Sequence, residues 1–301
     1  MGEVARFPAA RRRAAGTGPL RAGAAAAVGP GVAEPSRPGD TGGRSRHGRP
    51  VLGGGGRVVE RCDVLAVGAH PDDVELGCGG TLARLAAAGR RVGVLDLTAG
   101  ELATRGTPAE RAREAAAAAR ALGVAWRHAL DLPDGGLDSR DSAQRRAVVA
   151  VLRQATPTAV FFPHWLDPHP DHAAASRLVQ EACFLAGIPR WQEDLRGPHR
   201  PRLLLAYPGP RQLLTPHLVV DVTATAAAKR EALAAHASQF DPAAGAPTHL
   251  ATGHFLVAVE GRDRAAGNTV GCEVGEGFVA VGPLSGDAIA WLLGEGPCGS
   301  A

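Results

Sequence analysis

Two short clusters of histidine and aspartate contain the residue types that hold divalent metals and move protons. The first is His70-Pro71-Asp72-Asp73, and the second runs from His164 to His172 as H-x4-H-P-D-H. Catalytic zinc sites usually take three ligands from histidine and carboxylate and leave a fourth position for water. His70, Asp73 and His172 supply such a set, so we expect them to bind one divalent ion if the fold joins the clusters.

The remaining polar residues of the clusters suit acid–base roles beside that ion. Asp72 neighbours a ligand but points elsewhere by alternation, which makes it a candidate base for a metal-bound water. His169 is a candidate acid for the leaving amine or a donor to the oxyanion, and we expect the Asp171 carboxylate to orient it. Two histidines and one carboxylate also suit ferrous iron, so the residues alone leave zinc and iron both open.

A purely structural interpretation of the same aspartates also stands. Asp72 and Asp73 are well suited to cap a following helix, and Asp171 to cap the helix that it opens. Two such clusters, each placed between a strand and a helix, are harder to explain as caps alone.

The elements that must position these residues alternate between strands and helices. Short apolar runs predict the strands, and Ala-rich or amphipathic stretches ending at glycine predict the helices. The expected strands are 63–70, 91–98, 126–131, 159–164, 203–207 and 217–222. The expected helices are 78–89, 108–123, 141–155, one beginning near residue 171, and 224–237.

This alternation predicts an α/β fold with a Rossmann-like, doubly wound, mainly parallel sheet and helices on both faces. Ligands of such sheets bind beyond the carboxyl ends of the strands, where both clusters fall. Gly77, Gly79 and Gly80 do not form G-x-G-x-x-G. We therefore interpret them as allowing close helix–sheet packing, not as a phosphate loop.

Composition divides the chain into three parts. Residues 1–60 hold ten arginines against four acids in an Ala/Gly/Pro-rich background, and we expect a disordered leader. Residues 61–293 form the expected domain, with 23 basic and 26 acidic side chains beyond residue 60, and residues 294–301 form an expected flexible tail. This charge balance gives no basic surface for nucleic acid, and no apolar run is long enough to span a membrane. Five dispersed cysteines suit a reducing compartment, so we expect a cytoplasmic protein.

The strings AVGAHPDDVELGCGGTLARL and PHWLDPHPDHAAASRLVQEACFLAG resemble the LmbE/PIG-L family of zinc-dependent N-acetylglucosamine-type deacetylases. The resemblance covers nearly all of residues 61–293. It implies an LmbE-like fold, His70, Asp73 and His172 as zinc ligands, Asp72 as the base, and His169 with Asp171 as its partner. It also implies an acetylated amino-sugar substrate and a homo-oligomer.

Further strings are similar to the bacillithiol biosynthesis branch, which deacetylates N-acetylglucosaminyl malate: LTAGELATRGTPAERAREAAAAARALGV, GIPRWQEDLRGPHRP, EALAAHASQF and GEGFVA. The resemblance implies that Arg111 and Arg200 face the substrate, and guanidinium groups do suit the two malate carboxylates. It places His236 near the active site as well. The alternatives are an exposed Arg111 paired with Glu114, a loop position for Arg200, and a structural His236.

We therefore expect a zinc-dependent N-deacetylase that acts on N-acetylglucosaminyl malate. The alternative substrates are a mycothiol-type glucosaminyl inositol or another acetylated amino sugar. A sugar- or nucleotide-binding α/β module without catalysis is the alternative outside the enzyme class.

Overall fold

The computed structural model describes residues 59–292, and the expected leader and tail lie almost wholly outside this range. The described part is built on one seven-stranded sheet with the order β3-β2-β1-β4-β5-β7-β6. The strands are β1 Val64–Gly68, β2 Val92–Thr98, β3 Trp126–Leu132, β4 Ala159–Pro163, β5 Leu203–Tyr207, β6 Leu218–Asp221 and β7 Gly275–Ala280. The helices are α1 Asp73–Ala87, α2 Pro108–Ala121, α3 Ser142–Ala155, α4 Pro170–Ala186, α5 Ala226–Ala235, α6 Ala237–Phe240, α7 Phe255–Asn268 and α8 Gly286–Leu292.

The sheet is mainly parallel, which confirms the predicted fold class. β1 pairs with β2 and β4, and β3 and β5 continue the parallel sheet outward on either side. The exception is β7, which runs antiparallel to both β5 and β6 and was absent from the strands that we predicted. The parallel strands therefore all end at one edge, where the polar clusters follow them.

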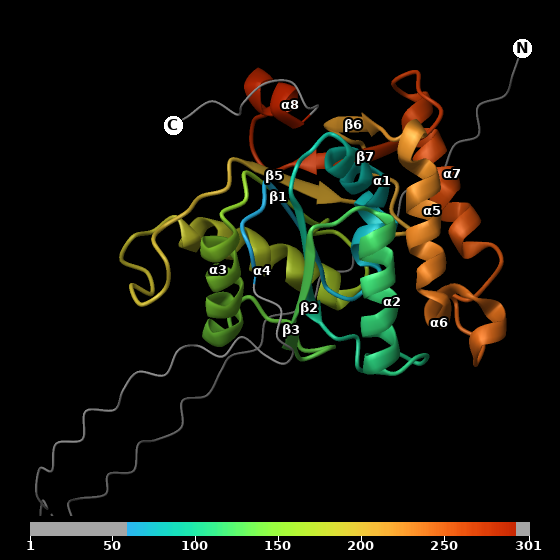
Figure 1. The fold of residues 1–301 in the computed structure, drawn as a ribbon, viewed down its shortest axis with the longest axis horizontal. Helices are drawn as coiled ribbons and strands as arrows, with labels where there is room; N and C mark the ends of the chain where they lie inside the picture. The colour runs from blue at the N-terminus through green and yellow to red at the C-terminus, as the bar shows by residue number, and fades with distance from the viewer. Residues whose placement is uncertain (1–58, 293–301) are drawn as a thin grey trace, which may run out of the picture. The chain divides into compact units, whose positions relative to one another are not determined.

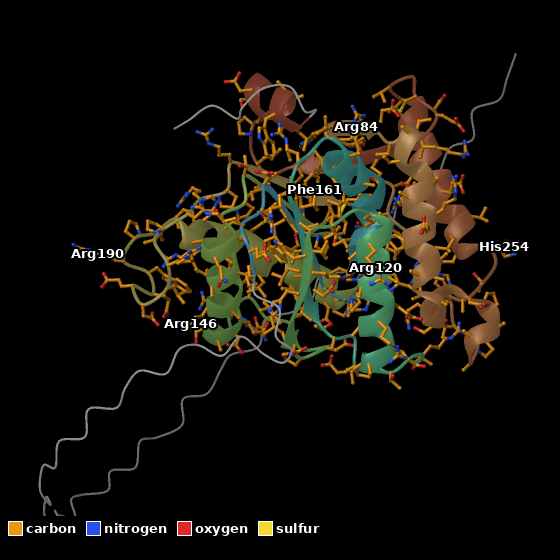
Figure 2. The ribbon with its side chains drawn as sticks, viewed as in Figure 1. Arg84, Arg120, Arg146, Phe161, Arg190 and His254 are labelled. Carbon is orange, nitrogen blue, oxygen red and sulfur yellow. The ribbon has the colours of Figure 1, made fainter. Side chains whose placement is uncertain are left out.

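Helices cover both faces of the sheet, as Figure 1 shows. α1, α2 and α5 share one apolar cluster with the sheet, and α3 and α4 share another on the opposite face. Figure 2 places Phe161 of β4 inside the molecule, whereas Arg120 of α2 is exposed. Both faces are thus buried, which explains why β1, β2 and β4 are apolar along most of their length.

The glycines of α1 bring this helix close to its neighbours. A Cβ on Gly77 would lie 2.1 Å from the Tyr207 ring, and one on Gly80 would lie 2.8 Å from Val222. This confirms close packing as the role of these glycines. The same contacts explain why we predicted the start of this helix too late. α1 begins at Asp73 and not near residue 78, because tertiary contacts keep the glycine-containing segment helical although glycine lowers helix propensity.

Among residues 59–292, no helix combines the length and apolar character needed to cross a bilayer.

Candidate metal centre

The two clusters meet at the carboxyl edge of the sheet because β1 and β4 are adjacent parallel strands. His70 follows β1 and His172 lies in the first turn of α4, which follows β4. Asp73 joins them: its Oδ1 lies 3.1 Å from His172 Nε2, and its Oδ2 lies 3.5 Å from His70 Nδ1. The three residues predicted as metal ligands are therefore in mutual contact, and each is at most 9% exposed.

Other side chains extend the set of candidate ligands. The rings of His70, His169 and His172 place one nitrogen each within 4.8 Å of the others, and His70 forms a similar group with Asp134 and Asp171. His70 Nε2 lies 3.1 Å from Asp134 Oδ1 and 3.4 Å from Asp171 Oδ2. Histidine nitrogen with carboxylate oxygen is a donor set that zinc and ferrous iron both accept.

The charges of the cluster also suit a divalent cation. Burial lowers the pKa of His70, but the Asp171 and Asp73 carboxylates outweigh it and raise that pKa to about 11. Burial likewise opposes protonation of His172, whose pKa is raised to about 10 by Asp73 and Asp167. The carboxylates thus favour a positive charge at this place. A divalent ion would supply that charge and leave both imidazoles neutral, which is the form that binds a metal.

Asp72 occupies a strained position beside the ligands. Its backbone has φ 117° and ψ −21°, a left-handed conformation that is unfavourable for a residue other than glycine. It sits at the N-cap of α1, yet its side chain makes no capping hydrogen bond. The alternative that the Asp72 side chain serves as a helix cap is therefore wrong, and such strain commonly accompanies functional positions.

Burial and one arginine set the electrostatics of Asp72. Burial raises its pKa to about 6 although the Arg111 guanidinium opposes the rise, and the Asp73 charge adds to it. Arg111 Nη2 lies 3.4 Å from Asp72 Oδ2 and donates to Pro71 O at 2.7 Å. A carboxylate with a raised pKa beside a metal centre can accept a proton near neutral pH.

Arg111 is buried, not exposed and paired with Glu114 as in the alternative interpretation. It is 3% exposed, and its Nη1 donates to Gly100 O at 3.0 Å. Glu114 instead accepts from the Ser238 backbone N–H at 2.7 Å. Arg111 does line the cleft, but both of its Nη groups already donate within the protein.

His169 is the N-cap residue of α4 and lies at the rim of the cluster. Its Nδ1 accepts from the Asp171 backbone N–H at 3.2 Å. The neutral ring therefore carries its proton on Nε2. Its ring centroid is 4.5 Å from that of His172 and 5.0 Å from that of His70. An Nε2–H group at this position suits the predicted role as donor to an oxyanion.

The Asp171 carboxylate does not contact a ring nitrogen of His169, so that part of the prediction needs correction. Its carboxylate turns toward the loop after β3, where Oδ2 accepts from the Gly135 N–H at 2.7 Å and lies near His70 Nε2. Burial opposes ionisation, but His70 and the Gly135 N–H lower the pKa of Asp171 to about 2. The reason is its place in the first turn of α4, from which only its backbone N–H reaches His169.

Two further aspartates of the site were missed by our sequence analysis. Asp167 Oδ2 lies 3.1 Å from His172 Nδ1, which places it to orient that ring, and its Oδ1 accepts from the His169 N–H at 2.8 Å. Asp134 follows β3 in the string LPDGG and contacts His70. The signal for both was their position after a parallel strand.

The structure does not bring Arg200 or the His236 ring into the cleft. Arg200 donates to Phe184 O at 3.1 Å and lies over the Phe184 ring at 4.6 Å, near the C-terminal end of α4. Since α4 begins at the site, Arg200 is roughly 18 Å away along that helix. His236 is fully buried, with Nε2 3.5 Å from Glu75 Oε1, and it does not line the cleft. It nevertheless lies near the predicted base, because it is among the groups that oppose the rise that burial causes in the pKa of Asp72.

The site opens into a cleft of about 730 Å³, within the range of small-molecule pockets. The metal-centre residues line one part of it, and loops after β2 and β5 and the segment before α7 line the rest. The residues of this second part include Leu102, Thr104, Arg105, Pro210, Arg211, Gln239 and Leu250. The arrangement can provide a metal, a base and a donor at the end of one cleft.

Known proteins are similar to this chain in sequence and in fold. Residues 65–183 match the family model of PIG-L, GlcNAc-PI de-N-acetylase. The chain is 34% identical over 188 residues to diacetylchitobiose deacetylase of Thermococcus kodakarensis, a match covering 59% of this chain and 70% of that protein. It is 30% identical over 243 residues to 1D-myo-inositol 2-acetamido-2-deoxy-alpha-D-glucopyranoside deacetylase of Streptomyces avermitilis, a match covering 59% of this chain and 83% of that protein. The solved structure of the conserved protein TT1542 from Thermus thermophilus aligns with TM-score 0.68 and 40% identity, covering 74% of this chain and 96% of that one.

Proposed function

The chain belongs to the PIG-L/LmbE family of deacetylases, and from this premise we propose that it is a metal-dependent hydrolase of the acetamido group on an N-acetylglucosaminyl compound. The observation that carries the proposal is the contact of His70, Asp73 and His172 at the floor of a cleft, with Asp72 buried beside them.

His70, Asp73 and His172 would hold the ion, zinc by our preference and ferrous iron as the alternative. When bound, a divalent ion polarises the amide carbonyl and lowers the pKa of water, from about 15.7 toward about 7 in favourable sites. Asp167 keeps the His172 ring in place through Nδ1, and Asp171 restrains His70 and the loop after β3.

Asp72 acts as the base of the reaction. It takes a proton from the attacking water, and the new C–O bond forms at the acetamido carbon. His169 donates a hydrogen bond from Nε2 to the developing oxyanion. The C–N bond then breaks as the amine nitrogen receives from Asp72 the proton that this carboxylate took from water. A free amine and acetic acid leave, and the acid ionises to acetate in solvent.

The substrate proposed from the sequence is N-acetylglucosaminyl malate, with the inositol conjugate as an equally supported alternative. The name of the Streptomyces relative favours inositol. Malate was favoured because of Arg111 and Arg200, but both arginines donate hydrogen bonds to the protein's own backbone. A preference for malate therefore requires another cationic side chain in the cleft that can bind its carboxylates.

The test is acetate release from N-acetylglucosaminyl malate, N-acetylglucosaminyl inositol and N,N'-diacetylchitobiose, with kcat/KM compared. We expect hydrolysis of at least one conjugate, abolished by a chelator and restored by zinc or ferrous iron. Absence of both bound metal and released acetate would instead favour a sugar-binding module without catalysis. A neutral conjugate preferred over the malate one would remove the bacillithiol assignment and leave the deacetylase intact.

A further inference from the structure

Arg105 is a buried arginine of the cleft whose hydrogen bonds are incomplete. It is 5% exposed and lies in the loop after β2, where it lines the cleft. Its Nη2 donates to Asp241 O at 2.6 Å, but Nε and Nη1 have no hydrogen-bond partner within residues 59–292. Buried donors without partners are rare and unfavourable, so two on one guanidinium suggest a partner that arrives from outside.

The positive charge of Arg105 also lacks a counterion. Within residues 59–292, no carboxylate forms an ion pair with it, and its one hydrogen-bond acceptor is a backbone carbonyl. Arg111 lines the same cleft, but it has Asp72 as its counterion and two carbonyl oxygens as acceptors, so that only its Nε lacks a partner. Of these two buried arginines, Arg105 is therefore the one whose charge has no counterion and whose terminal Nη1 group makes no hydrogen bond within residues 59–292.

The protein holds Arg105 in place without using up these donors. Gln239 Nε2 donates to Arg105 O at 2.8 Å, which fixes the backbone, and the Asp241 carbonyl fixes one end of the guanidinium. Gly245 lies against the side chain, and a Cβ there would come within 3.2 Å of Nε. The guanidinium is therefore positioned before any ligand binds, which lowers the entropy lost on binding.

We propose that Arg105 binds an anionic group, a carboxylate by preference, on the aglycone of the acetylated amino sugar. The inference rests on the proposed deacetylase function, because the acetamido group must lie at the metal centre while the rest of the substrate extends along the cleft. A planar guanidinium suits a carboxylate through paired N–H donors, and phosphate offers the same chemistry. The cleft thus selects a charged conjugate over a neutral one.

The test compares Arg105→Gln and Arg105→Lys with the wild type on three substrates. These are N-acetylglucosaminyl malate, N-acetylglucosamine 1-phosphate and the neutral N-acetylglucosaminyl inositol. We expect Arg105→Gln to lower kcat/KM for the malate conjugate by about 10- to 100-fold, mainly through KM, and to change the inositol conjugate by less than about twofold. Arg105→Lys should recover part of the loss. A selective loss with the phosphate compound instead would keep the subsite and make phosphate its occupant.

Arg113→Gln is the matched control, because it removes a positive charge from the exposed face of α2. It should leave all three substrates unchanged. An equal loss for charged and neutral substrates in Arg105→Gln, or no loss, would overturn the proposal. Thermal melting of each variant shows whether a loss reflects unfolding.

A direct binding measurement separates this proposal from the deacetylase assignment. L-malate and inorganic phosphate are titrated calorimetrically into the zinc-loaded wild type, Arg105→Gln and Arg113→Gln. At least about tenfold weaker binding of one anion to Arg105→Gln alone supports the subsite even if no acetate is released. Equal affinities in all three proteins would overturn it even if the enzyme is a deacetylase.

Discussion

Two buried groups of charged residues lie beside α1. They differ in the balance between cations and carboxylates and in access to solvent. One is the metal centre, where carboxylates from several loops surround His70 and His172 at the floor of a cleft. The other we call the Lys229 cluster: Lys229, Arg262, Asp263 and Glu276. Lys229 Nζ lies 2.6 Å from both Asp263 Oδ2 and Glu276 Oε1.

The Lys229 cluster is balanced and closed. Two cations face two carboxylates, and Glu276 also accepts the Gly80 and Thr81 N–H groups at 3.0 and 2.7 Å. The metal centre has an excess of carboxylates and opens into the cleft. Both groups therefore bury charge. What distinguishes the metal centre is that its carboxylates outnumber its cations and that it opens into the cleft.

The largest effect should follow from removing a proposed ligand. His172→Ala deletes a nitrogen donor that Asp73 and Asp167 hold in place, so we expect loss of stoichiometric metal, measured by elemental analysis of the purified protein. His254→Ala, at the exposed position labelled in Figure 2, is the control and should keep its metal. Retention of one zinc per chain by His172→Ala would remove this residue from the ligand set.

A change in the Lys229 cluster should affect stability and not the metal. Lys229→Met leaves the Asp263 and Glu276 carboxylates buried without their shared cation, which should lower the free energy of unfolding by about 3–5 kcal/mol. Urea denaturation measures this value. Metal content and activity per folded molecule should stay normal, and loss of metal from folded Lys229→Met would erase the distinction between the two groups.

A smaller effect should come from the aspartate behind a ligand. Asp167→Asn keeps the size of the side chain but removes the charge that faces His172 Nδ1, so we expect metal affinity to fall about 10- to 100-fold. Competition with a chromophoric chelator measures the affinity. An unchanged affinity would show that His172 needs no partner at Nδ1.

Sequence reasoning reached the parts of this fold that depend on local patterns. The apolar runs of β1, β2 and β4 and the clusters that follow them sufficed to predict a parallel sheet with a metal centre at its edge. β7 was missed because its string GEGFVA is short and rich in glycine, and its pairing with β5 and β6 depends on contacts distant in sequence.

The contacts between side chains of the site were harder to predict than the residues that form it. Asp171 and His169 are neighbours in sequence, yet the first turn of α4 directs the Asp171 carboxylate to Gly135 and His70. Asp134 and Arg105 come to the site on loops after other strands, so no local spacing could reveal them. Tertiary packing decides which side chains face one another, and local sequence patterns do not contain that information.

The central claim is that His70, Asp73 and His172 hold a metal while Asp72 acts as the base, and Asp72→Asn tests it most directly. Asparagine keeps the shape of the side chain but cannot accept the proton, so we predict about one metal ion per chain and acetate release reduced by at least about 10²- to 10⁴-fold. Metal analysis and acetate release are measured on the same sample. A variant with normal metal and full turnover would contradict the assignment of Asp72 as the base.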